Sequence, residues 1–138
     1  MRAPQPRPSQ LRRERAAWWG RDRGSEPVEF AIVASAMIVV TFVVIQVGLV
    51  YFARSIALGA ATQGVTAGRA YGALPGAGEN RAWDFLEQAG DGLTGQGVDV
   101  NQTAGEIEIT VSGFAISVVP GITFEVSQSA HGSIEQPS

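Results

Sequence analysis

A run of 24 residues without a charged side chain, Phe30 to Ala53, constrains this chain more than any other feature. The run is rich in Val and Ile, and Gln46 is its only strongly polar side chain. As an α-helix rising about 1.5 Å per residue it would be roughly 36 Å long, enough for a hydrocarbon core of about 30 Å. Because backbone polar groups in lipid must pair within the segment, the run predicts a helix that crosses a membrane.

The charges on the two sides of this run have opposite signs. The 138 residues carry a net charge of −3, and all ten basic residues are Arg. Residues 1–24 contain seven of these arginines and two acidic residues, which gives +5, and the rest of the chain carries −8. The positive-inside rule therefore predicts a cytoplasmic N-terminus and an exported C-terminal part.

The leader, residues 1–24, is polar and contains three prolines, so we expect it to be disordered. A short helix from Leu11 to Trp19 is compatible with its composition. Trp18 and Trp19 fit either a membrane interface, where indoles are enriched, or exposed positions on the leader.

Residues 54–72 are dominated by small side chains, and we expect them to continue the helix. Ala60, Gly64 and Gly68 recur every four residues, so they share one face and predict close packing of another helix. Low-complexity drift in an Ala/Gly-rich sequence is the alternative. Packing is favoured because each glycine in a solvated helix would cost about 1 kcal/mol.

A break at residues 72–78 precedes a predicted amphipathic helix from about Asn80 to Ala89, with Asn80 as its N-cap. Trp83, Leu86 and Phe85 are expected to form the apolar face of this helix. Four glycines then indicate a loop: Gly90, Gly92, Gly95 and Gly97.

Apolar and polar residues alternate after this loop, from Val98 to Val100 and from Ile107 to Val111, which predicts β-strands. The alternation changes phase after Gly113, which indicates a β-bulge there. Val119–Gly121 is typical of a type II turn, and a last strand is expected from Ile122 to Ala130. We therefore expect three strands in an antiparallel meander, with one face covered by the helices.

These expectations give an α+β fold: a long N-terminal transmembrane helix, its exported extension, a short amphipathic helix and a three-stranded antiparallel sheet. The predicted divisions are a leader (1–24), the long helix (25–72) and a small extracytoplasmic domain with a polar C-terminal tail (73–138). Residues 79–138 number only 60, near the lower limit for an independent domain. Packing on the extended helix or on a partner subunit is expected to supplement their core.

Several kinds of chemistry are disfavoured by composition. The chain has no cysteine, which excludes a disulfide scaffold, an iron–sulfur cluster and a thiolate zinc site. Its only histidine, His131, argues against a catalytic triad or a multi-histidine metal site. Glu106 and Glu108 share a strand face and suggest a carboxylate pair, but solvent-facing alternation explains them better. We expect no catalytic residue, metal or cofactor.

A distinctive group of residues lies where the basic leader meets the apolar run. Gly24 has no Cβ, which lets an extended backbone enter a protease cleft closely. Pro27 suits the first turn of a helix, and Glu29 gains about 0.3–1 kcal/mol from the helix dipole. A simple membrane flank explains each residue singly, but not the five-residue spacing of Gly24 and Glu29 beside a basic leader.

That combination resembles the processing site of type IV prepilins and, more closely, that of the tight-adherence (Tad/Flp) pilus system. Further matches extend over roughly residues 20–130 and look like the TadE-like family of minor pilins, in its actinobacterial type. They are Gly24-Ser25, Val28–Ala31, Gln46–Leu49, Tyr51–Arg54, Gln63-Gly64, Ala67–Ala70 and Val118–Gly121.

The resemblance implies a small, non-catalytic, pilin-like subunit that takes part in assembling or anchoring a surface pilus. It implies cleavage between Gly24 and Ser25 by a prepilin peptidase, and pairing of Glu29 with the N-terminal amine of a neighbouring subunit. The implied partners are the lipid bilayer, that peptidase, other Tad pilus subunits and membrane platform proteins. Nucleic acid is not among them, since positive-inside topology already accounts for the basic leader.

Two other hypotheses remain, an enzyme and a single-span or secreted binding protein with an N-terminal signal-anchor. Ala57–Gly59 faintly resembles a signal-peptidase site, and cleavage there would release a soluble fragment starting near Ala60. The apolar run is longer than an h-region of 7–15 residues, and Arg54 intervenes.

Overall fold

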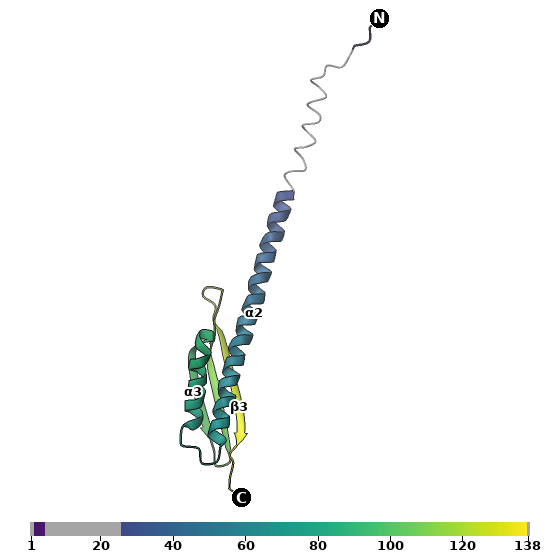
Figure 1. Ribbon diagram of the computed structural model, residues 1–138. Coiled ribbons are helices and arrows are strands. Elements are labelled where there is room, and N and C mark those ends of the chain that lie inside the picture. The colour runs from purple at the N-terminus through teal and green to yellow at the C-terminus, as the bar shows by residue number, and fades with distance from the viewer. Residues whose placement is uncertain (1, 5–25, 138) are drawn as a thin grey trace. The chain divides into compact units, whose positions relative to one another are not determined.

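The computed structural model describes residues 2–4 and 26–137. The predictions for the leader helix, for Trp18 and Trp19 and for the Gly24-Ser25 junction lie outside the described residues. In chain order, these residues form α2 (Glu26–Arg69), α3 (Ala77–Ala89), the 3₁₀-helix η1 (Gly90–Gly92), β1 (Leu93–Gln102), β2 (Glu106–Ala115) and β3 (Phe124–Ser133) (Figure 1). The predicted α+β class, with a long apolar helix, a short helix and a three-stranded antiparallel sheet, is confirmed.

Helix α2 is 44 residues long and belongs to two compact units, which divide between Phe42 and Val43. Pro27 lies in its first turn, as expected, and Arg69 lies in its last turn. Within the described residues, α2 is the one helix that is long and apolar enough to cross a membrane.

The unit that begins at Val43 contains the rest of α2 together with α3 and the sheet. The strands are ordered β1-β2-β3, and β2 pairs antiparallel with both neighbours. Along β2 the side chains alternate as predicted: Ile107, Ile109 and Val111 are buried, and Thr110 faces outward toward Ser129. The period of two in the sequence thus identifies the face of the sheet that is covered.

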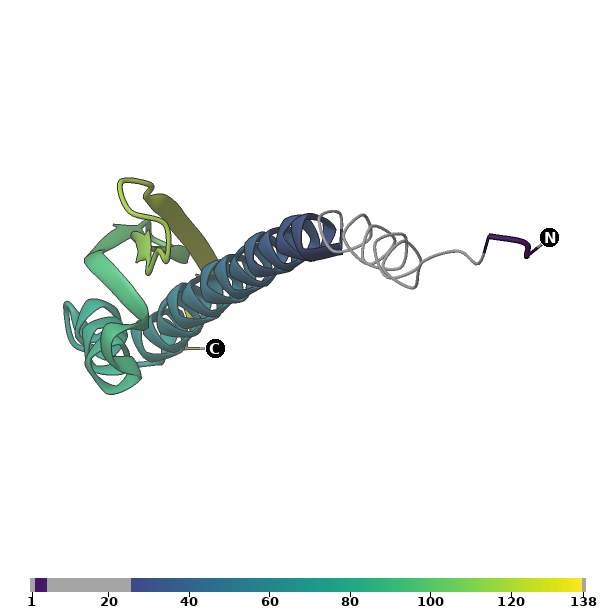
Figure 2. The same cartoon turned by 90° about the horizontal axis from the view of Figure 1, so that it is seen from above.

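Both helices cover this one face of the sheet (Figures 1 and 2). The closest approach involves Gly64 of α2, Gly78 of α3 and Ile109 of β2. A Cβ atom at Gly64 would lie 2.7 Å from Ile109 Cδ1 and 2.8 Å from the carbonyl oxygen of Gly78. The absence of a side chain at Gly64 therefore lets the three elements share one core.

The short helix differs from its prediction in two respects. It begins at Ala77, after Gly76 in the left-handed region, so the Asn80 N-cap is wrong: the Asn80 N–H donates to the Gly76 carbonyl inside the helix. Trp83 is 37% exposed and does not belong to the buried face, whereas Ala82 and Leu86 do. The Ala82 methyl group lies beside Gly64 of α2, and Trp83, one residue further along, is turned by about 100° around the helix axis from this contact.

The bulge is on the opposite strand from the predicted one. Strand β1 begins at Leu93, so Gly95 and Gly97 lie within it rather than in a loop, and its pairing shifts between Thr94 and Gly97. The alternation of β2 continues through Gly113, which faces inward. A Cβ at Gly113 would lie 2.7 Å from Leu93 Cγ, so the Leu93 side chain occupies that space.

The turn at Val119–Gly121 is confirmed. The Ile122 N–H donates to the Val119 carbonyl at 3.4 Å, and Gly121 has φ +78°, as the third position of a type II turn requires. The flanking strands end earlier and start later than expected, so residues 116–123 form the β2–β3 loop, and β3 runs to Ser133 rather than to Ala130.

Candidate functional site

The part of α2 before Val43 has apolar side chains that no other described residue covers. Val28, Phe30, Ile32 and Val39 are all more than half exposed. The hydroxyl groups in this stretch pair with carbonyls of the same helix: Ser35 Oγ donates to Ala31, and Thr41 Oγ1 donates to Met37, each at 2.8 Å. A surface of this kind is compatible with hydrocarbon because its polar groups are already satisfied.

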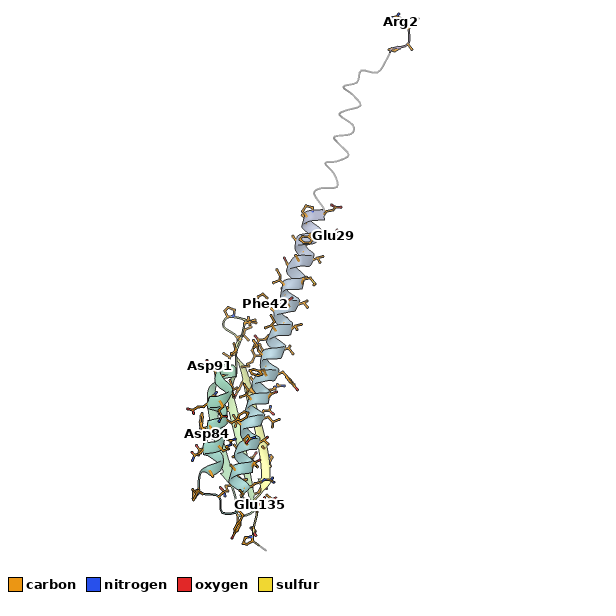
Figure 3. The ribbon with its side chains drawn as sticks, in the orientation of Figure 1. Arg2, Glu29, Phe42, Asp84, Asp91 and Glu135 are labelled. Carbon is orange, nitrogen blue, oxygen red and sulfur yellow. The ribbon has the colours of Figure 1, made fainter. Side chains whose placement is uncertain are left out.

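Glu29 lies in the first turn of α2 and is exposed (Figure 3). The helix dipole stabilises a carboxylate there. Among residues 2–4 and 26–137, no cation lies within ion-pair distance of its carboxylate. The structure thus leaves Glu29 at the end of the helix, accessible to a group outside the described residues.

The small-residue face of α2 contacts other elements of the same chain. Ala60 is fully buried. A Cβ at Gly68 would lie 2.5 Å from Ile107 Cδ1 and 3.4 Å from the Cα of Gly78. Gly64 contacts the same two elements, α3 and β2. Ala60 and Gly64 are therefore buried in the domain, and the half-buried Gly68 packs on Ile107 at its edge.

Gln46 has a contact that sequence reasoning missed. It is the one buried polar side chain in the described part of the chain, at 8% exposure. Its Nε2 donates to the Ile116 carbonyl at 3.2 Å, and its Oε1 accepts from the Val118 N–H at 2.9 Å. Its polarity within an apolar run was a visible signal, but a partner some seventy residues away was not.

The outer face of the sheet carries a cluster of three titratable side chains, those of His131, Glu106 and Glu108. His131 Nδ1 lies 3.8 Å from Glu106 Oε1, and its Nε2 lies 3.6 Å from Glu108 Oε1. Together with Asn101 and Thr103 these side chains line a hollow of about 200 Å³. All three side chains, of His131, Glu106 and Glu108, are at least one-third exposed, so an ion pair here would contribute at most about 1 kcal/mol.

This cluster has the features of a solvated strand face. Within the described ranges, no group of three or more His, Asp or Glu side chains is arranged to hold a metal ion. His131 is a surface residue, as the sequence predicted.

Comparison with known proteins adds one finding. Residues 24–66 match the family described as TadE-like protein. The matched segment includes Gly24, Ser25, Glu29 and the whole apolar run, and it confirms the family resemblance over these residues. No curated protein and no solved structure matches the chain.

Proposed function

We propose that this chain, whose residues 24–66 match the TadE-like family, is a minor pilin or pseudopilin of a Tad-type (type IVb) pilus. It would take part in assembling or anchoring the pilus at the cell envelope. The family match is the observation that carries this proposal, because it covers the leader junction and the apolar helix together.

In this proposal α2 anchors the protein as a single span, with the N-terminus in the cytoplasm and the sheet outside. The charge of +5 before the span and −8 after it supports this orientation. The exposed apolar surface of α2 and the internally bonded hydroxyls of Ser35 and Thr41 support residence in lipid. Partners would be a prepilin peptidase, other Tad pilus subunits and membrane platform proteins.

Cleavage between Gly24 and Ser25 would make Glu29 the fifth residue of the mature chain. The carboxylate of Glu29 would then pair with the new N-terminal amine of a neighbouring subunit. An unpaired carboxylate near the hydrocarbon layer is costly, and pairing offsets that cost. The position of Glu29 in the first turn of α2 supports this role.

The role we propose is structural rather than enzymatic. The only His in the chain and its two glutamate neighbours are exposed on a sheet face, where a reacting group would not be shielded from water.

A secreted binding protein, the alternative, fits the fold less well. Signal-peptidase cleavage near Ala57–Gly59 would cut α2 between Ala57 and Ala60, both of which are fully buried. A fragment starting at Ala60 would lose Ala53, Ile56 and Ala57 from its core.

Mass spectrometry of the native protein, purified from cells with an active Tad peptidase, tests the processing step. We expect a mature chain that begins at Ser25. A Gly24→Val variant, in which a branched side chain replaces the glycine, should keep its leader. A wild-type chain that still begins at Met1 or Arg2 would show that the proposed processing is wrong.

Substitution of Glu29 tests the pairing role. We expect Glu29→Ala to insert into the membrane normally but to reduce piliation, scored by electron microscopy and surface adherence. Glu26→Ala is the matched control, because Glu26 lies in the same helical turn and should be dispensable. Normal piliation by the Glu29→Ala strain would contradict the pairing role.

A further inference from the structure

The β2–β3 loop, residues 116–123, has an unusual surface. It lies inside a stretch of 16 residues without a charge, from Ile109 to Phe124. Ile116, Val119 and Ile122 are 43%, 38% and 48% exposed, so three large apolar side chains face outward from one short loop. In Figure 1 the loop lies at the opposite end of the sheet from the turn between α2 and α3.

Gln46 sets the position of this loop along α2. A helix needs about 20 residues to cross the hydrocarbon core. Every window of 20 residues within the charge-free run 30–53 contains Gln46. Because the Gln46 side chain forms hydrogen bonds with the backbone of Ile116 and Val118, the backbone of the loop must lie at the same depth as Gln46.

Several polar groups of the loop backbone are paired within the protein. The Gln46 amide satisfies the Ile116 carbonyl and the Val118 N–H. Ser117 Oγ accepts from the Val119 N–H at 3.1 Å and donates to the Val119 carbonyl at 2.9 Å. Pro120 has no N–H to satisfy. Irregular backbone that faces lipid does not persist deep in the hydrocarbon region, so these pairings suit a shallow position at the edge of the apolar layer.

We propose that the β2–β3 loop is a second membrane contact of this protein. Ile116, Val119 and Ile122 insert among the acyl chains of the leaflet on the side of the sheet, next to the point where α2 leaves the bilayer. The occupant of this surface is lipid, because Gln46 holds the loop beside the outer part of the apolar run, at the edge of the hydrocarbon layer. The proposal rests on the membrane span proposed above.

Single-cysteine labelling tests this contact directly, since the wild-type chain has no cysteine. Full-length protein with Val119→Cys carries an environment-sensitive fluorophore and is reconstituted in phosphatidylcholine–phosphatidylglycerol vesicles. Brominated acyl chains quench from the lipid, and iodide quenches from water. Val39→Cys, within the span, and Ala104→Cys, in the β1–β2 turn at the far end of the sheet, are the controls.

We expect the labels at Val119 and Val39 to lose emission with brominated lipid, and the label at Ala104 to lose emission with iodide. If the Val119 label is quenched by iodide, like the Ala104 label, while the Val39 label is quenched by brominated lipid, the loop contact is wrong and the proposed span is supported. If the Val39 label is also quenched by iodide rather than by brominated lipid, the span and the membrane part of the proposed function are wrong. If Val119 is shielded from both quenchers, the loop is covered by protein and the lipid assignment is overturned.

A second variant tests whether Gln46 holds the loop at this depth. Gln46→Leu removes both hydrogen bonds but remains apolar, so α2 should insert as before. We expect the Val119 label to shift from lipid quenching to iodide quenching, with an unchanged circular dichroism spectrum. Thr41→Val, which removes only a bond within the helix, should leave the label in lipid. Unchanged lipid quenching in Gln46→Leu would overturn the role of Gln46.

Discussion

Gly64 shows how a single residue decides the packing of this chain. It lies where α2, α3 and β2 meet, and no side chain fits between them. The nearest neighbours of its missing Cβ are the tip of Ile109 and the backbone carbonyl of Gly78, and the carbonyl cannot rotate away. Gly48, on the same helix, has no atom within 4 Å of the corresponding position.

These two glycines make a matched pair of substitutions. We expect Gly64→Ala to destabilise the domain by about 1–3 kcal/mol through overpacking. Gly48→Ala should stabilise the helix by roughly 0.5–1 kcal/mol, because alanine loses less backbone entropy than glycine. Thermal unfolding in detergent micelles, followed by circular dichroism, measures both. Equal effects of the two substitutions would show that the space around Gly64 is not limiting.

At the scale of elements, α2 combines two roles in one helix. Before Val43 its apolar side chains are exposed, and from Ala53 to Val65 one face is part of the domain core. The 60 residues from 79 to 138 therefore share a core with α2. Their small number had suggested that they need such a supplement. Strand β2 is the central strand of the sheet that completes this core, since it pairs with both β1 and β3.

Strand β2 offers a second matched pair, at adjacent positions on opposite faces. Ile109 is fully buried, and Ile109→Ala should cost about 2–5 kcal/mol by leaving a cavity. Thr110→Ala removes only an exposed bond to Ser129 and should cost less than about 1.5 kcal/mol. Chemical denaturation of the full chain in micelles distinguishes the two. A similar loss for both would mean that the helices do not cover the predicted face.

For the molecule as a whole, the distribution of charge is more informative than its sum. A net charge of −3 describes an ordinary acidic protein, but the leader carries +5 and the remainder −8. For a chain that inserts as proposed, the positive-inside rule predicts from this asymmetry that the arginine-rich segment stays in the cytoplasm.

Reporter fusions test the orientation. Alkaline phosphatase fused after Ser138 should be active in wild-type cells, because the proposed orientation places the C-terminus outside the cytoplasm. Replacement of the seven leader arginines by glutamine should abolish most of this activity by removing the orienting charge. Arg54→Gln, beyond the apolar run, should leave the activity unchanged. An active reporter in the leader variant would show that another feature orients the chain.

Much of the fold could be predicted because it depends on local pattern. Twenty-four residues without a charge leave a helix as the way to satisfy the backbone in lipid, and a period of two identifies the buried face of β2. The turn at Val119–Gly121 follows from the fixed φ of proline and the positive φ that glycine allows. The segment that resembles the TadE-like family was also visible in the sequence, because its residues are contiguous.

Other features were decided only by the tertiary structure. Trp83 looked like a core residue and is more than one-third exposed, because the face of α3 that contacts the core contains Ala82 and Leu86 instead. Gly113 was predicted to mark a β-bulge and instead makes room for the side chain of Leu93 on the neighbouring strand β1. The sequence determined the type and order of the main helices and strands, since these depend on neighbours along the chain, but it did not determine where β1 and β3 begin. The bonding of Gln46 to the β2–β3 loop joins residues some seventy positions apart, and only the packed chain brings them together.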